Sequence, residues 1–274
     1  MNLENKVALV TGGGAGLGAA IAARFVADGA KVCISGRRKE VLEETAHSIG
    51  SENITICSGD VSKQGDVKKM IETAVKFGCK LNVLLNNAGI NLPGPVADLD
   101  PEMWNKVIGI NLSGPFLTMK EAISHMLKAG AGSIINIASV GGMRCLPGMP
   151  AYCASKGGLI MLTQQAALDY GKYGIRCNAV CPGGIKTEMV QNTFCESGRA
   201  VNIEPETFIK QIAADTPLRR FADPPEITGL CSFLASDDSL FMTGSAITID
   251  GGGTIVDIVG ASITAAMRKG GLVD

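Results

Sequence analysis

The segment VALVTGGGAGLGAAIAARFVADG, residues 7–29, joins a short apolar run to an amphipathic run through a cluster of glycines. Gly12, Gly16 and Gly18 predict, in turn, a tight bend, a close approach of the backbone to a ligand and close packing of a helix on a strand. The backbone N–H groups and the dipole at the start of such a helix favour a phosphate group. A sharp strand-to-helix bend needs glycine in any case, but this position between the first strand and the first helix indicates nucleotide binding.

The same alternation of apolar and amphipathic segments continues along the chain. Because the apolar runs are unbroken, they are typical of strands buried on both faces of a parallel sheet. With about six amphipathic segments between them, they predict an α/β fold of Rossmann type: a doubly wound, mostly parallel, seven-stranded sheet with helices on both faces, in a single domain spanning residues 1–274. The runs after the first are KVCIS (31–35), NITICSGD (53–60), LNVLLNNAG (81–89), GSIINIAS (132–139), IRCNAVCPGG (175–184) and SAITIDGGG (245–253).

Two segments depart from this alternation. Residues 188–220 contain helix-forming pieces but no strand, and they follow a Pro-Gly-Gly turn, so we expect a substrate lid, with an additional packing helix as the alternative. Residues 254–274 form a largely apolar C-terminal extension, which we expect to cover the site or an interface.

Composition narrows the class of protein. The 274 residues are 46 % hydrophobic and 19 % charged, with a formal net charge of −1, which gives no reason to expect nucleic acid or a membrane as a partner. No apolar run is long enough to span a bilayer, and the first residues indicate a strand and not a signal peptide, so a cytoplasmic location is expected. The nine cysteines lack the spacing of a zinc site, so we expect reduced thiols and no bound metal.

The end of the second strand bears on the choice of cofactor. Dinucleotide-binding folds that use NAD(H) carry an acidic residue here, about 20 residues after the glycines, to bind the ribose hydroxyls. This chain has Gly36 in that place, followed by Arg37 and Arg38. A guanidinium group can donate two parallel hydrogen bonds to a 2′-phosphate, which favours NADP(H) and leaves NAD(H) open. The alternative is that Arg37 only caps a solvated helix.

Tyr152 and Lys156 are separated by one helical turn, so they point the same way on a helix. A surface pair without function remains open on this spacing alone. Together with other motifs in order, however, the chain resembles the compact branch of the short-chain dehydrogenase/reductase family over nearly its whole length. The motifs are TGGGAGLG (11–18), NNAG (86–89), INLSGPF (110–116), SIINIAS (133–139), YCASK (152–156), CPGGIKTEM (181–189) and GSAITIDGGG (244–253).

The resemblance implies four catalytic residues. Tyr152 would be the general acid in carbonyl reduction and the general base in alcohol oxidation. Lys156 would lower the pKa of that phenol by favouring the phenolate and would also hold the nicotinamide ribose. Ser139 would hydrogen-bond the substrate oxygen. Asn111, within a long helix over residues 101–128, would hold a water molecule that links Lys156 to solvent.

The resemblance also implies contacts to the cofactor, at the carboxyl ends of the strands where an open parallel sheet binds its ligand. Besides Tyr152 and Lys156, these residues are Gly12, Ala15, Gly16, Leu17, Gly18, Arg37, Arg38, Asp60, Val61, Asn87, Ala88, Gly89, Ile110, Pro182, Gly183, Ile185 and Thr187. For the substrate we expect an apolar wall made of Ile90, Leu92, Met143, Cys145, Leu146, Met149 and Met189.

These features predict an NAD(P)-dependent oxidoreductase that reduces a ketone with an apolar body, or oxidises the corresponding secondary alcohol, with NADPH as the favoured reductant. The alternatives are an NAD-dependent secondary-alcohol dehydrogenase of a catabolic route and a non-catalytic nucleotide-binding relative. An enoyl reductase of the same fold is disfavoured because its tyrosine and lysine are commonly further apart. Keto-acyl thioesters, steroids, cyclic ketones and sugars all remain open as substrates.

The family resemblance implies a homotetramer. Its long helices, here around residues 101–128 and 151–171, commonly pack pairwise between subunits. The small and apolar residues GGLIMLTQQAAL (157–168) are compatible with that packing and equally with packing on the chain's own sheet.

Overall fold

The computed structural model describes residues 2–188, 190–193, 202–257, 260, 262–263 and 266–267. Its sheet has seven strands in the order β3-β2-β1-β4-β5-β6-β7, and every neighbouring pair is parallel. This confirms the predicted Rossmann-type sheet. The strands are β1 (Val7–Thr11), β2 (Lys31–Gly36), β3 (Ile54–Ser58), β4 (Val83–Asn86), β5 (Gly132–Ile137), β6 (Ile175–Pro182) and β7 (Ala246–Ile249).

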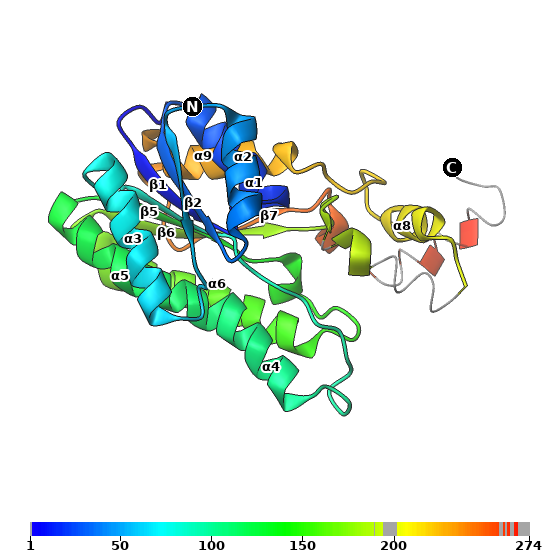
Figure 1. Cartoon of the computed structure of the whole chain (residues 1–274). Coiled ribbons are helices and arrows are strands. Elements are labelled where there is room, and N and C mark those ends of the chain that lie inside the picture. Colours follow the sequence, from blue (N-terminus) through cyan, green and yellow to red (C-terminus); the bar gives the residue numbers. More distant parts are fainter. Residues whose placement is uncertain are drawn as a thin grey trace.

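Helices cover both faces of the sheet, as Figure 1 shows. Side chains of α1, α2 and α9 pack into one apolar core, and those of α3, α5 and α6 pack into another on the opposite face. Every residue of β1, β4 and β6 is therefore buried, which explains why these strands are continuous apolar runs. The helices are α1 (Gly16–Ala27), α2 (Lys39–Ile49), α3 (Gln64–Gly78), α4 (Pro101–Ile108), α5 (Gly114–Ala129), α6 (Pro150–Tyr170), α8 (Pro205–Ala213) and α9 (Pro225–Ala235).

The strand order reverses at the centre of the sheet. β1 pairs with β2 on one side and with β4 on the other, and the chain winds outward in opposite directions from this point. In open parallel sheets the ligand crevice lies at such a reversal, beyond the carboxyl ends of the strands. The topology therefore brings the glycine turn after β1 and the NNAG segment after β4 to one crevice.

The helical segment expected over residues 101–128 is interrupted. Between α4 and α5 lies one π-helical stretch, Gly109–Ser113, and it contains Asn111. A π-bulge of this kind changes the direction of a side chain within a helix and is frequent at functional sites. The position of the Asn111 side chain is thus set by this π-helical turn and not by a regular α-helix.

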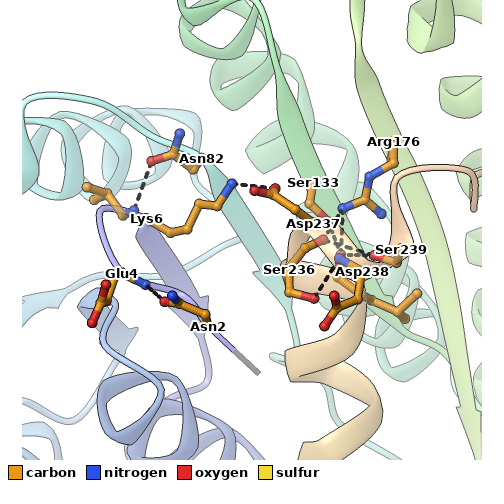
Figure 2. A network of polar contacts seen from close by, with 12 residues as sticks. Asn2, Glu4, Lys6, Asn82, Ser133, Arg176, Ser236, Asp237, Asp238 and Ser239 are labelled. Carbon is orange, nitrogen blue, oxygen red and sulfur yellow. Dashed lines mark hydrogen bonds and ion pairs between the residues drawn. The ribbon is translucent and has the colours of Figure 1, made fainter.

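A polar network fastens the C-terminal end of α9 to the amino-terminal edge of the sheet (Figure 2). Arg176, at the start of β6, donates to the carbonyl oxygens of Leu234 at 2.8 Å and Ser236 at 3.2 Å. Lys6, just before β1, forms an ion pair with Asp237 at 2.7 Å. Burial lowers the pKa of Arg176, and the charge of Asp237 opposes this effect. The network lies at the opposite edge of the sheet from the cavity described below.

The two segments that depart from the strand–helix alternation are only partly described. In the segment expected to form a lid, residues 188–220, α8 lies apart from the helices that cover the sheet (Figure 1). The described part of this segment contains no strand. Of the C-terminal extension, the structure describes a 3-10 turn at Gly253–Ile255 and a few residues beyond it. Within the described ranges, no helix is long and apolar enough to cross a membrane.

Candidate active site

The glycine turn has the geometry that its sequence predicts. Gly12 and Gly16 adopt positive φ angles of 65° and 54°, a conformation that side chains other than glycine rarely tolerate. Ala15 precedes α1 without a side-chain cap, so the backbone N–H groups of the first helical turn have no side-chain partner there. These N–H groups, at the positive end of the helix dipole, suit a phosphate.

The NNAG segment is clamped against the glycine turn. The Asn87 amide donates to the carbonyl oxygens of Thr11 and Gly12, both at 3.1 Å. In return, the Thr11 hydroxyl accepts from the backbone N–H groups of Asn87 at 3.0 Å and Ala88 at 3.2 Å. The clamp ties the segment after β4 to the end of β1, at the point where the sheet order reverses.

A cavity of about 640 Å³ lies in this crevice. Its volume is within the range of small-molecule and cofactor sites. Nearly all residues predicted to contact the cofactor line it, and the exception is Gly18, which packs against Gly12 and Asn87 beneath the turn. The predicted residues in the lining are Gly12, Ala15, Gly16, Leu17, Arg37, Arg38, Asp60, Val61, Asn87, Ala88, Gly89, Ile110, Tyr152, Lys156, Pro182, Gly183, Ile185 and Thr187, together with Ser139 and Ile90.

Two exposed arginines lie on the rim of the cavity, after β2. Arg37 and Arg38 both line the cavity, and neither takes part in the ion pairs found among the described residues. Arg38 is the N-cap residue of α2, but no side chain caps that helix. The alternative role of Arg37 as a helix cap therefore finds no support. Burial raises the pKa of Asp60, but hydrogen bonds from Ser62 and, to a lesser degree, the charge of Arg37 across the rim hold that pKa below its ordinary value.

Tyr152 and Lys156 both lie on α6 and reach the same end of the cavity. The Lys156 Nζ atom lies 5.7 Å from the centroid of the Tyr152 ring and donates to the carbonyl oxygen of Ile137 at 2.7 Å. Only 5 % of Lys156 is exposed. Burial lowers its pKa from 10.5 to about 8, so the ammonium form still predominates at neutral pH.

The structure does not show the expected lowering of the Tyr152 pKa by Lys156, which is not among the groups that shift it. Burial raises the pKa of Tyr152, and a hydrogen bond with Ser139 opposes that effect without outweighing it. The Lys156 ammonium is directed to the Ile137 carbonyl oxygen and not to the phenol oxygen. The phenol is therefore protonated at neutral pH, which is the form that a general acid requires.

Asn111 has its amide occupied by three partners. Its oxygen accepts from the N–H of Ile90 at 2.8 Å, and its nitrogen donates to the Ile90 carbonyl oxygen at 2.8 Å and to the Ser155 hydroxyl at 3.2 Å. Asn111 does not line the cavity but lies directly behind Gly89, where an added Cβ would be 3.4 Å from the Asn111 oxygen and 3.6 Å from Lys156 Nζ. It therefore fixes the backbone after NNAG beside the lysine.

Only part of the expected apolar substrate wall is found at the cavity, where Leu146 lies next to Gly141 beside Tyr152 and Ser139. Ile90 lines the cavity itself, whereas Leu92, Met143, Cys145, Leu146 and Met149 do not. Met143 is 51 % exposed and Cys145 is also exposed, because the loop between Ser139 and Tyr152 turns outward after the short 3-10 helix Val140–Gly142. Met189 lies outside the described residues.

The cavity also includes residues that sequence reasoning missed. Gly59, Ile137 and Ala138 directly precede Asp60 and Ser139, so extending each strand end by one or two residues would have found them. The helical residues after Thr187 carried no such signal. The full set is Gly14, Gly36, Val41, Leu42, Gly59, Ile137, Ala138, Glu188, Val190 and Asn192.

Comparisons with known proteins agree with this arrangement. A family model described as enoyl-(acyl carrier protein) reductase matches residues 12–254. Meso-2,3-butanediol dehydrogenase of Serratia marcescens is 39 % identical, over 94 % of this chain and 98 % of that protein. NADP-dependent (R)-specific alcohol dehydrogenase of Lentilactobacillus kefiri is 38 % identical, over 92 % of this chain and 98 % of that protein. The crystal structure of levodione reductase is similar with a TM-score of 0.89 and 33 % identity, over 93 % of this chain and 99 % of that one.

Each of these three similarities covers more than nine-tenths of the chain. The relatives' names agree on oxidation and reduction as the kind of reaction. The chain therefore belongs to the short-chain dehydrogenase/reductase family of oxidoreductases.

Proposed function

We propose that this protein is a cytoplasmic, NADPH-dependent carbonyl reductase that converts a ketone with an apolar body to a secondary alcohol, and that catalyses the reverse oxidation when the alcohol is in excess. The observation that carries the proposal is that Ser139, Tyr152 and Lys156 line the same cavity as the glycine turn. The site therefore joins a phosphate-binding turn to a protonated phenol. The relatives named for alcohol and ketone substrates support the same reaction class.

The residues of the chain have separate tasks in this reaction. The glycine turn would hold the phosphates of the cofactor and Pro182 and Thr187 its nicotinamide end, and the bound cofactor would supply hydride. Tyr152 donates its proton to the substrate oxygen, and Ser139 hydrogen-bonds that oxygen as negative charge develops there. Lys156 supplies a positive charge beside the phenol as the proton leaves. Asn111 holds the Ile90 backbone in place beside this group.

The preference for NADPH is tested by titrating the purified protein with NADPH and with NADH while following nicotinamide fluorescence. Because Arg37 and Arg38 are exposed on the rim, we expect NADPH to bind more tightly. Arg37→Asp should weaken NADPH binding by roughly 10–100-fold, the effect of a lost charge-assisted hydrogen bond, and NADH binding much less. Arg144→Asp, the same charge change outside the cavity lining, is the matched control.

Equal losses for both cofactors in Arg37→Asp would show that this side chain does not bind the 2′-phosphate. A preference for NADH in the unaltered protein would favour the alternative, an NAD-dependent secondary-alcohol dehydrogenase. If neither cofactor binds, the non-catalytic alternative is favoured.

The description of the matching family model supports a second candidate, reduction of an enoyl thioester. The spacing of Tyr152 and Lys156 favours carbonyl reduction instead. A panel with NADPH and a vicinal diketone, a cyclic diketone, a β-ketoacyl thioester and an enoyl thioester separates the two. Turnover of the enoyl thioester alone would overturn the proposed reaction.

We also propose that the protein assembles as a homotetramer through α4, α5 and α6. Apolar side chains on these helices are exposed in the single chain, with Trp104 at 38 %, Phe116 at 49 % and Leu168 at 78 %. Burial of such side chains between subunits would remove apolar surface from water. Multi-angle light scattering should give four times the mass of the chain, and a monomer would contradict the proposal.

A further inference from the structure

Two cysteines lie close together beside the catalytic tyrosine, outside the cofactor cavity. Cys153 follows Tyr152 in the first turn of α6, and Cys145 lies in the outward-turned loop before that helix. The backbone N–H of Leu146, the residue after Cys145, donates to the Cys153 sulfur at 3.3 Å. The loop that carries Cys145 is thus already in contact with the thiol of Cys153.

The backbone of Cys145 lies close to the Cys153 sulfur. Covalent geometry puts the Cα atom of Cys145 about 2.4 Å from the Leu146 nitrogen, so the Cys153 sulfur lies within about 5.7 Å of that Cα atom. Bridged cysteines commonly have Cα atoms about 4.4–6.8 Å apart and sulfur atoms about 2.0 Å apart, so the bond requires the loop to bring the Cys145 sulfur onto that of Cys153. Pro147 and Gly148 follow in the loop, and Gly148 has a positive φ of 67°. The thiols also differ in access, since Cys145 is exposed and Cys153 is only partly so.

Movement of this loop would reach the catalytic residues through Leu146. A Cβ atom added to Gly141 would lie 3.0 Å from Leu146 Cδ1, 3.2 Å from Tyr152 Cε1 and 3.3 Å from the Ser139 hydroxyl oxygen. The side chain of Leu146 therefore lies beside both Tyr152 and Ser139. Drawing Cys145 toward α6 would move Leu146, the next residue, beside the two groups that are to bind the substrate oxygen. The glycine turn is not part of this contact.

We propose that Cys145 and Cys153 form an oxidant-dependent disulfide that closes the substrate side of the active site and leaves cofactor binding intact. Hydrogen peroxide is the oxidant. The exposed Cys145 thiolate attacks one peroxide oxygen, the O–O bond breaks, and Cys145 becomes a sulfenic acid as hydroxide leaves. The Cys153 thiolate then attacks the Cys145 sulfur, the S–S bond forms, and the sulfenic oxygen leaves as hydroxide. With the two thiol protons, the products are one disulfide and two water molecules.

Peptide mapping of the peroxide-treated protein tests the bond itself. We expect a linked peptide that joins Cys145 to Cys153, absent from protein treated afterwards with dithiothreitol. In Cys153→Ser the sulfenic acid of Cys145 should persist and be labelled by dimedone. Failure to find the linked peptide, or Cys145 linked to another cysteine, would overturn the proposal. This arm needs no substrate, so its outcome is separate from that of the proposed carbonyl reduction.

The activity arm rests on the proposed function and compares oxidised with reduced protein within each variant. Peroxide should lower ketone turnover by roughly 10²-fold, the effect of misplacing a substrate by about 1 Å, and dithiothreitol should restore it. NADPH binding should change by less than a few-fold. Cys145→Ser and Cys153→Ser should each lose this sensitivity, whereas Cys79→Ser, which removes an exposed thiol elsewhere, should keep it. If peroxide still lowered ketone turnover in both Cys145→Ser and Cys153→Ser, the proposed closure would be contradicted.

Discussion

Replacing Tyr152 by Phe is expected to lower kcat for ketone reduction by roughly 10²–10⁴-fold, the usual contribution of a positioned general acid. The substitution removes one hydroxyl group and keeps the ring that packs beside Gly141 and Leu146. Because the phenol is not part of the glycine turn, NADPH should still bind within a few-fold of its original affinity. Steady-state kinetics combined with fluorescence titration of NADPH separates the two effects.

The matched control is Tyr170→Phe, which removes the same hydroxyl at the other end of α6, where Tyr170 packs against the apolar core. It should leave kcat within a few-fold of the original value. Equal losses in the two variants would indicate damage to the helix and not loss of an acid. Retained turnover in Tyr152→Phe would remove Tyr152 from the mechanism.

The pH dependence follows from the direction of the Tyr152 shift. Because burial raises the pKa of the phenol, it stays protonated through neutral pH, and the rate of ketone reduction should be nearly flat there. Alcohol oxidation needs the deprotonated form, so its rate should rise with pH over the same range. Lys156 has a pKa of about 8, so it loses its positive charge as the pH rises through that value.

The cofactor half of the site could be predicted from the sequence because its residues follow strand ends. Gly12, Asp60, Asn87 and Pro182 each lie at the end of a strand or within two residues after it, and carboxyl ends of parallel strands meet at one edge. Sequence spacing therefore determined their placement before any tertiary contact was known. All four line the cavity.

The substrate half could not be predicted in the same way. Met143, Cys145 and Met149 lie between Ser139 and Tyr152 in sequence, but the loop turns outward and is held by contacts with distant residues, such as the hydrogen bond of 2.8 Å from Gly94 N–H to the Gly148 carbonyl oxygen. The pKa of Tyr152 likewise depends on a balance between burial and a hydrogen bond that no motif encodes. The π-helical stretch at Asn111 also could not be predicted, because a single π-helical turn inside a helix leaves no periodic pattern of apolar residues in the sequence.

Gly18→Ala should have the second large effect, on both folding and cofactor binding. A Cβ atom at this position would lie 2.2 Å from the Gly12 carbonyl oxygen and 2.5 Å from the Asn87 amide nitrogen. Neither atom can move freely, because they are hydrogen-bonded to each other at 3.1 Å across the NNAG clamp. We expect a loss of roughly 1–3 kcal/mol in the free energy of unfolding, as for overpacked cores, measured by urea denaturation.

The loss of cofactor affinity in Gly18→Ala should be larger than the loss of stability suggests. The added methyl group should displace the Gly12 carbonyl and so turn the N–H groups at the start of α1 away from the phosphates. The loss of two or more charge-assisted hydrogen bonds, at about 1.5–3 kcal/mol each, corresponds to a loss of roughly 10²-fold or more in NADPH affinity. Gly229→Ala is the matched control, because a Cβ there meets nothing within 4 Å on α9. That variant should gain roughly 0.4–1 kcal/mol and bind NADPH as before. If Gly18→Ala matched Gly229→Ala in stability and in NADPH affinity, the glycine turn could accommodate the methyl group. The hydrogen bond between Asn87 and Gly12 would then not determine the geometry of the phosphate site.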